Sequence, residues 1–257
     1  MMMFMRFGGG AIALVLAVSL AACGSGQVSD VATDVDEAGA TTPGEVADAS
    51  LPPGAEALPQ LGGKATVVIS VNGQNIEIEV DGDAAPITAG NFVDLVQRQV
   101  YDGTLFHRVV RQPTPFVVQG GDPQSKDPNV PPNALGTGSF RDPATGAARL
   151  IPLEILPEGA DTPIYSATFE GEGISASPAL SHTRGAVAMA RSPAPDSASA
   201  QFYFALADLA PLDGSYAVFG YVTDGMDVVD EIQQGDRIES ATVTEGLENL
   251  KQPGSAE

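Results

Sequence analysis

The feature that most constrains the fold is a hairpin near residue 70, where Asn72-Gly73 separates two runs of strand-forming residues. Both turn residues tolerate a positive φ, which a two-residue hairpin turn requires. Residues 74–80 then alternate isoleucine and valine with glutamate, so one face of this strand is apolar and the other is charged. A hairpin with one buried and one solvated face predicts an antiparallel sheet.

Further short segments with the same character follow along the chain. Their residues are branched, aromatic or small, and turn residues separate them, since the chain contains 29 glycines and 20 prolines. Helical periodicity appears in only two places, residues 86–99 and 226–234. Many short strands and two helices predict a mainly β, closed antiparallel barrel. Besides 65–71 and 74–80, the expected strands are 104–110, 116–119, 185–190, 201–206, 216–223 and 237–244.

The first 22 residues resemble a secretory signal. Ala11–Ala22 is a run of small and apolar residues that follows the single charge of Arg6. This run is shorter than the roughly 20 residues that span a bilayer, and it fits the apolar region of a signal peptide. The sequence Leu20-Ala21-Ala22-Cys23 resembles a bacterial lipoprotein signal, which implies lipidation at Cys23. The alternative is an ordinary cleaved signal with an incidental cysteine.

The remaining chain divides by composition. Residues 24–63 contain seven acidic residues and no lysine or arginine, which predicts a disordered acidic tether behind Cys23. The folded domain is expected at 64–246, and a C-terminal tail at 247–257. Within the domain, residues 123–180 form a long segment rich in proline and glycine, which we expect to be an ordered insertion. The sequence thus predicts an exported, membrane-anchored lipoprotein that faces the periplasm or extracytoplasmic space.

Charge and residue counts exclude several classes of function. The formal net charge of −21 disfavours nucleic acid, because affinity for phosphates depends on lysine and arginine. The single cysteine excludes a disulfide framework and a multi-cysteine zinc site. Neither an H-E-x-x-H motif nor a G-x-S-x-G motif occurs. Of the two glycine-rich stretches, 8–10 lies in the predicted signal peptide and 136–138 does not lead into a helical pattern. We therefore expect no metal and no cofactor.

Five sequence blocks carry the most specific signal. They begin with Phe106-His107-Arg108 and continue through 116–123, 185–191, 199–204 and 212–220. In this order the blocks resemble the cyclophilin-type peptidyl-prolyl cis–trans isomerases, over about residues 64–245. The resemblance implies an eight-stranded antiparallel barrel capped by two α-helices, with the substrate on the outer face of the barrel.

The resemblance also implies roles for single residues. Arg108 matches the catalytic arginine of the family, Gln119 matches the glutamine that positions it, and Phe116 matches a residue of the proline pocket. Other positions match substrate-binding residues, although Val117 is commonly methionine, Arg191 asparagine, Tyr203 phenylalanine and Tyr216 histidine in relatives. The implied substrate-binding residues are Val117, Gly136, Ala190, Arg191, Gln201, Tyr203, Leu212 and Tyr216.

The implied function is a non-covalent enzyme. Arg108 would stabilise the twisted amide of an X–Pro bond in exported proteins, and the protein would act as a monomer on proline-containing segments. The chain departs from the common pattern at residues 111–115 and in the long segment 123–180, both of which border the groove. Two alternatives remain open: a non-catalytic chaperone that binds proline peptides in the same groove, and a scaffold that acts through the insertion.

Overall fold

The computed structural model describes residues 51–254 of the 257-residue chain. The expected signal peptide, Cys23 and most of the acidic tether lie outside the described residues. No helix within residues 51–254 is both long enough and apolar enough to cross a membrane.

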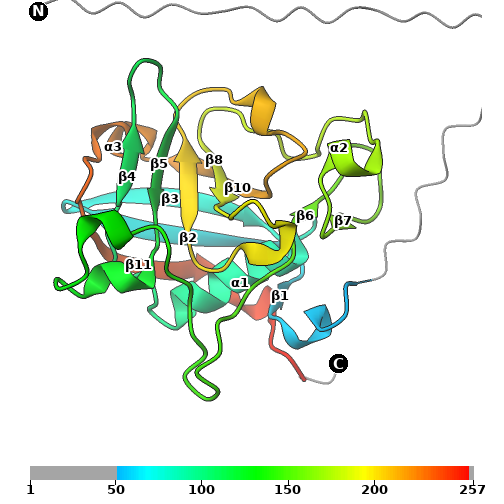
Figure 1. Cartoon of the computed structure of the whole chain (residues 1–257), viewed down its shortest axis with the longest axis horizontal. Coiled ribbons are helices and arrows are strands. Elements are labelled where there is room, and N and C mark those ends of the chain that lie inside the picture. Colours follow the sequence, from blue (N-terminus) through cyan, green and yellow to red (C-terminus); the bar gives the residue numbers. More distant parts are fainter. Residues whose placement is uncertain (1–50, 255–257) are drawn as a thin grey trace, which may run out of the picture. The chain divides into compact units, whose positions relative to one another are not determined.

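Eight antiparallel strands form the main sheet, in the order β11-β2-β3-β10-β8-β9-β5-β4 (Figure 1). Each of the eight segments that the sequence predicts contributes one of these strands. Their bounds are β2 Lys64–Val71, β3 Gln74–Asp81, β4 Arg108–Val110, β5 Val117–Gly120, β8 Ala186–Met189, β9 Phe202–Ala205, β10 Val218–Asp224 and β11 Ile238–Glu245.

The sheet is curled and open, so the expected closed barrel is wrong. Strands β4 and β11 form the two edges and share no ladder within the described chain. Just before each strand begins, the edges approach each other at an isolated bridge between Leu105 and Arg237, and backbone hydrogen bonds such as that from the Gly103 amide to the Ile238 carbonyl (2.7 Å) flank it. The reason is the length of β4: strand geometry covers only the last three residues of the predicted 104–110 segment, and these pair with β5.

The β2–β3 hairpin has the predicted register. Val71 pairs with Gln74 across the turn, and Asn72 and Gly73 both have the positive φ that the turn requires, 53° and 73°. Alternate residues of both strands are buried. Their apolar face belongs to the main hydrophobic core, in which the rings of Phe92, Phe202 and Phe219 also pack.

Residues 51–254 contain three α-helices where the sequence predicts two. Helix α1, Pro86–Gln97, contacts β1 and β11 and is buried along most of its length. Helix α3 spans Met226–Glu231. The unpredicted helix α2, Phe169–Glu172, is too short for a periodic pattern, and it is fixed locally by the Thr168 hydroxyl, which accepts a hydrogen bond from the Gly171 amide at 3.1 Å.

Both ends of the domain extend beyond the boundaries that composition suggests. Strand β1, Gln60–Leu61, precedes the expected start at 64, and strand β12, Leu250–Lys251, follows the expected end at 246. These two strands pair with each other, and Leu61 is only 1% exposed. An apolar stretch as short as 58–61 inside an acidic region gives little sequence signal, because its partner strand lies about 190 positions away along the chain.

The predicted insertion, residues 123–180, contains regular secondary structure. It contributes strands β6, Glu154–Ile155, and β7, Ile164–Tyr165, in addition to α2. The buried carboxylate of Glu154 accepts hydrogen bonds from the backbone amides of Ile87 (3.1 Å) and Thr88 (2.8 Å) at the start of α1. Burial raises the pKa of Glu154. The insertion therefore caps α1, whose own N-cap residue supplies no side-chain hydrogen bond.

Single-turn 3₁₀ helices connect these elements. They span Ala55–Ala57, Pro123–Lys126, Pro132–Ala134, Pro195–Ser197, Ala210–Leu212 and Leu247–Asn249.

Gly90 tests the packing of β1 on α1. A Cβ at Gly90 would lie 2.5 Å from the Cα of Gln60, which is too close for any real contact. Helix propensity alone predicts that Gly90→Ala stabilises the protein by about 1 kcal/mol. The structure predicts the reverse, a loss of about 1–3 kcal/mol from overpacking. Urea denaturation measures the difference, and a higher unfolding midpoint in the variant would show that β1 does not lie on α1.

Candidate functional site

Arg108 stands at the start of β4, directly opposite Gln119 of β5. Its Nη1 donates a hydrogen bond to the side-chain oxygen of Gln119 at 3.2 Å, and its guanidinium carbon lies 5.6 Å from the ring centroid of Phe116. Within the described chain no carboxylate pairs with Arg108. The guanidinium is therefore held by a neutral amide, and its charge is not compensated by a nearby acid.

A chain of side-chain amides fixes the orientation of Gln119. Its Nε2 donates to the Oε1 of Gln201 at 3.3 Å, and the Nε2 of Gln201 donates to the backbone carbonyl of Gly138 at 2.8 Å. Gln201 is 8% exposed. Because each amide donates to the next, the oxygen of Gln119 is left to face Arg108.

A cavity of about 230 Å³ opens beside Arg108. It lies on the face of the sheet opposite the main core: Val117 and Tyr203 belong to a separate apolar cluster, while their chain neighbours Val118 and Phe204 belong to the core. We call it the first cavity. Every residue that lines it was predicted as a site residue: Arg108, Phe116, Val117, Gln119, Ala190, Arg191, Tyr203, Leu212 and Tyr216.

A second cavity of about 340 Å³ lies alongside and shares Gln119, Ala190 and Arg191 with the first. The predicted residues Gly136 and Gln201 line this second cavity and not the first. Hydroxyl side chains that the sequence analysis did not single out make up much of its wall, because isolated serines carry no pattern. These are Thr137, Ser139, Ser192, Ser197 and Ser199.

The buried carboxylate of Asp122 shapes the glycine turn at the second cavity. One oxygen accepts hydrogen bonds from the amides of Gly136 (2.6 Å) and Gly138 (3.2 Å), and the other from that of Gln124 (2.9 Å). A Cβ at position 138 would lie 2.0 Å from Oδ1 of Asp122, so any side chain there would displace the carboxylate from these hydrogen bonds. Asp122 thus fixes one wall of the second cavity through hydrogen bonds to backbone amides.

Arg191 lies in both cavities but differs from Arg108 in its bonding. Its Nε and Nη2 donate to the carbonyl of Ser215 at 3.0 and 2.6 Å, and its Nη1 donates to that of Ser192 at 2.9 Å. Its guanidinium carbon also lies 4.6 Å from the ring centroid of Tyr216. Arg191 is therefore a fixed part of the wall, whereas Arg108 has one hydrogen bond within the described chain, to Gln119.

A buried histidine behind the first cavity was assigned no role from the sequence. His182 Nδ1 lies 2.8 Å from the Asp213 carboxylate, and its Nε2 lies 2.9 Å from the hydroxyl of Tyr203. Burial lowers the pKa of His182, so the neutral ring donates to Asp213 and accepts from Tyr203. Tyrosine in place of the usual phenylalanine was the available signal, because a buried hydroxyl needs a partner.

His107 lies next to Arg108 in the chain but packs toward the second cavity. Its Nε2 would lie 3.3 Å from a Cβ at Gly136, and burial lowers its pKa. No hydrogen-bond partner for either ring nitrogen is present in the described chain. No group of three His, Cys, Asp or Glu side chains within residues 51–254 is arranged to hold a metal ion.

Comparison with known proteins decides the family. The sequence model for "Cyclophilin type peptidyl-prolyl cis-trans isomerase/CLD" matches residues 66–250. The chain belongs to this family. Among cyclophilin structures, one from Cryptosporidium parvum superposes with a TM-score of 0.52 at 21% identity, covering 71% of this chain and 98% of that one.

The curated relatives include proteins that this chain covers to different extents. A Synechocystis protein, named as a candidate thylakoid lumen peptidyl-prolyl cis-trans isomerase, is 44% identical over 75% of this chain and 50% of its own length. A peptidyl-prolyl cis-trans isomerase of Acinetobacter baylyi is 36% identical over 65% of this chain and 70% of its own length. The chain thus spans about half the length of the first of these cyclophilin relatives.

The lowered pKa of His182 predicts how stability depends on pH. Below the ordinary histidine pKa of about 6.5, the unfolded chain binds a proton at His182, whereas the folded cyclophilin domain keeps this ring neutral. The free energy of unfolding therefore decreases as the pH is lowered. His182→Gln removes this contribution. Urea denaturation between pH 7.5 and about 5 should give a shallower fall in the variant than in the wild type. Equal slopes would mean that His182 is not buried in its neutral form.

Proposed function

We propose that this cyclophilin-family chain is a peptidyl-prolyl cis–trans isomerase and that Arg108 is its catalytic residue. The observation that carries the proposal is the position of this uncompensated guanidinium at an apolar cavity, bonded to the neutral amide of Gln119. The names of its relatives, which are isomerases, support the activity. No proton transfer or covalent intermediate is required.

The chemistry follows from the amide bond. Rotation about the peptide C–N bond faces a barrier of about 18–20 kcal/mol because the bond is partly double. At the top of the barrier the proline nitrogen has lost its resonance and carries a lone pair. A guanidinium hydrogen bond to that nitrogen is made only in the twisted state, so it lowers the barrier without tightening the ground state. Arginine suits this role because it stays charged and offers several donors.

The apolar wall of the first cavity supplies the other requirement, which is a fixed proline ring. Phe116, Val117, Tyr203 and Leu212 line the first cavity and not the polar second cavity. A ring held there leaves the residue before proline free to rotate. Ala190, Arg191 and Gln119 line both cavities, so a peptide that crosses from one to the other passes along them.

A structural relative supports the choice of substrate. A Cryptosporidium parvum cyclophilin of the same fold, with a TM-score of 0.51 and 22% identity, was crystallised in the presence of the dipeptide Ala-Pro. We infer that proline-containing segments bind this chain with proline in the first cavity. Binding without turnover remains the second candidate, favoured by the long connection 111–115 that enters the strand next to Phe116.

Arg108→Ala separates the two candidates, with Arg111→Ala as the matched control. Arg111 is on the same hairpin, but its Nη2 donates to the carbonyls of Val229 and Asp230 at the end of α3, away from the cavity. We expect Arg108→Ala to lose about 100-fold or more of kcat/KM on an X–Pro peptide, as loss of a transition-state donor does. The assay is protease-coupled isomerisation, and Arg111→Ala should match the wild type.

Two outcomes would overturn this assignment. Near-wild-type turnover in folded Arg108→Ala would remove Arg108 from the mechanism. Peptide binding by the wild type without any turnover would replace the isomerase with a binding module.

We further propose that the protein is exported and held at a membrane by a lipid on Cys23. The pattern of residues 11–23 supports export, as do relatives named for the thylakoid lumen and the chloroplast. Cys23→Ser should move the protein from the membrane fraction to the soluble extracytoplasmic fraction of cells that express it. Equal recovery of both forms in the membrane fraction would contradict lipidation at Cys23.

A further inference from the structure

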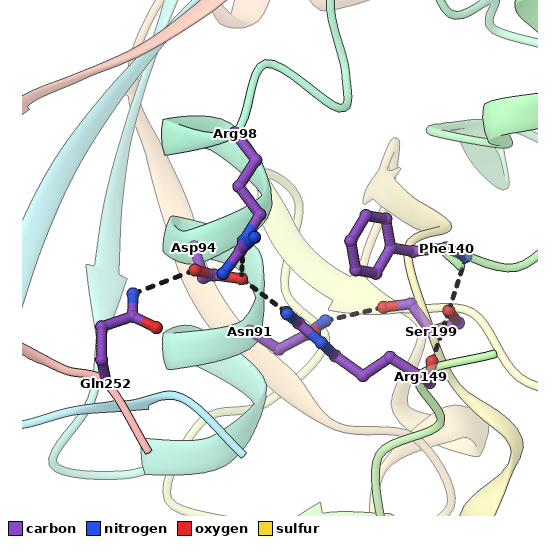
Figure 2. A network of polar contacts seen from close by, with 7 residues as sticks. All are labelled: Asn91, Asp94, Arg98, Phe140, Arg149, Ser199 and Gln252. Carbon is purple, nitrogen blue, oxygen red and sulfur yellow. Dashed lines mark hydrogen bonds and ion pairs between the residues drawn. The ribbon is translucent and has the colours of Figure 1, made fainter. Parts of the chain in front are cut away.

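A buried carboxylate joins three parts of the chain that are distant in sequence. Asp94 of α1, whose side chain is 1% exposed, accepts hydrogen bonds from Arg98 Nε at 2.8 Å, Arg149 Nη1 at 2.5 Å and Gln252 Nε2 at 3.0 Å. Figure 2 shows these donors converging on Asp94 from the helix, the insertion and the C-terminal segment. The network lies outside the residues of the first cavity.

The charges in this network depend on each other. Burial alone raises the pKa of Asp94, but the hydrogen bonds from Arg149, Arg98 and Gln252 outweigh it, and the pKa lies below its usual value. Arg149 is itself largely buried, with its side chain 11% exposed and its guanidinium carbon 4.7 Å from the ring centroid of Phe140. Removing one partner of such a pair leaves the other buried and uncompensated.

Arg149 also reaches the groove through its backbone. Its carbonyl accepts a hydrogen bond from the hydroxyl of Ser199 at 2.7 Å, and that hydroxyl in turn accepts from the amide of Phe140 at 2.9 Å. The carbonyl of Ser199 accepts from the side chain of Asn91 at 2.7 Å (Figure 2). Ser199 lines the second cavity two positions before Gln201. Both the hydroxyl and the carbonyl of Ser199 are therefore held by hydrogen bonds of this network.

We propose that Arg149 is a positioning residue for the groove. By pairing with Asp94 it fixes the backbone that holds Ser199, and with it the wall of the second cavity. The proposal rests on the proposed isomerase site, because it assigns to the second cavity the part of a peptide substrate that flanks the X–Pro bond. Loss of the Arg149 contact weakens the binding of peptides long enough to reach Ser199 and leaves the chemistry at Arg108 unchanged.

The structure offers a matched control in Arg98. Both arginines pair with the same oxygen of Asp94, but Arg98 lies one turn further, at the C-terminal end of α1, is 42% exposed, and lines neither cavity. Arg98→Gln therefore removes a partner of Asp94 without breaking the connection to Ser199. Arg149→Gln removes the guanidinium that ties the backbone beside Ser199 to Asp94, although the carbonyl bonded to Ser199 itself remains, while Arg149→Lys keeps the charge.

The test compares the four full-length proteins on two substrates, a hexapeptide with a central X–Pro bond and a blocked X–Pro dipeptide. Arg149→Gln should raise KM for the hexapeptide by about three- to tenfold, the equivalent of roughly one hydrogen bond, with kcat within about twofold. The dipeptide KM should not change. Arg98→Gln should match the wild type on both peptides, and Arg149→Lys should recover most of the hexapeptide KM.

Binding measurements keep this test independent of turnover. NMR titration gives Kd for both peptides and the amide shifts of Ser199 and Gln201, so the proposal is tested even if the wild type does not catalyse isomerisation. Should Arg149→Gln fail to fold, Asp94→Asn takes its place, because it weakens the same ion pair from the side of the helix. Equal hexapeptide affinity in Arg149→Gln, or its replacement, and in Arg98→Gln, or an equal loss for both peptides, would overturn the proposal.

Discussion

The site depends on keeping one positive charge without an acidic partner in a protein of formal net charge −21. Arg108 is bonded to the neutral side chain of Gln119, which is oriented through Gln201 by the backbone carbonyl of Gly138. A carboxylate in place of this amide would pair with the guanidinium and compete with the substrate nitrogen. The amide chain therefore supplies geometry without neutralising the charge on which the proposed mechanism depends.

Several acids of the domain are instead occupied in holding the backbone. Asp122 fixes the glycine turn of the second cavity, Glu154 caps α1, and Asp94 joins α1 to Arg149 of the insertion. Each of these carboxylates is buried and satisfied by amide or guanidinium donors, as a buried charge requires. All three contacts involve residues of the insertion 123–180, so this segment supports both the helix and the second cavity.

The sequence predicted the local features well and the long-range ones poorly. Alternation and turn residues located all eight strands, and the family resemblance named every residue of the first cavity, because both depend on neighbours in sequence. The open edge between β4 and β11, the pairing of β1 with β12, and the contacts of Ser199 and His182 depend on partners dozens of positions away. No periodicity records such partners.

The central claim is that the bound X–Pro bond rotates while the peptide remains in the groove. Exchange NMR measures this directly, by following the cis and trans signals of an X–Pro peptide in the presence of a small amount of the full chain. The account predicts exchange cross-peaks that grow with protein concentration and are absent from the peptide alone, whose uncatalysed isomerisation takes tens to hundreds of seconds. Peptide signals that shift on binding but show no accelerated exchange would contradict it.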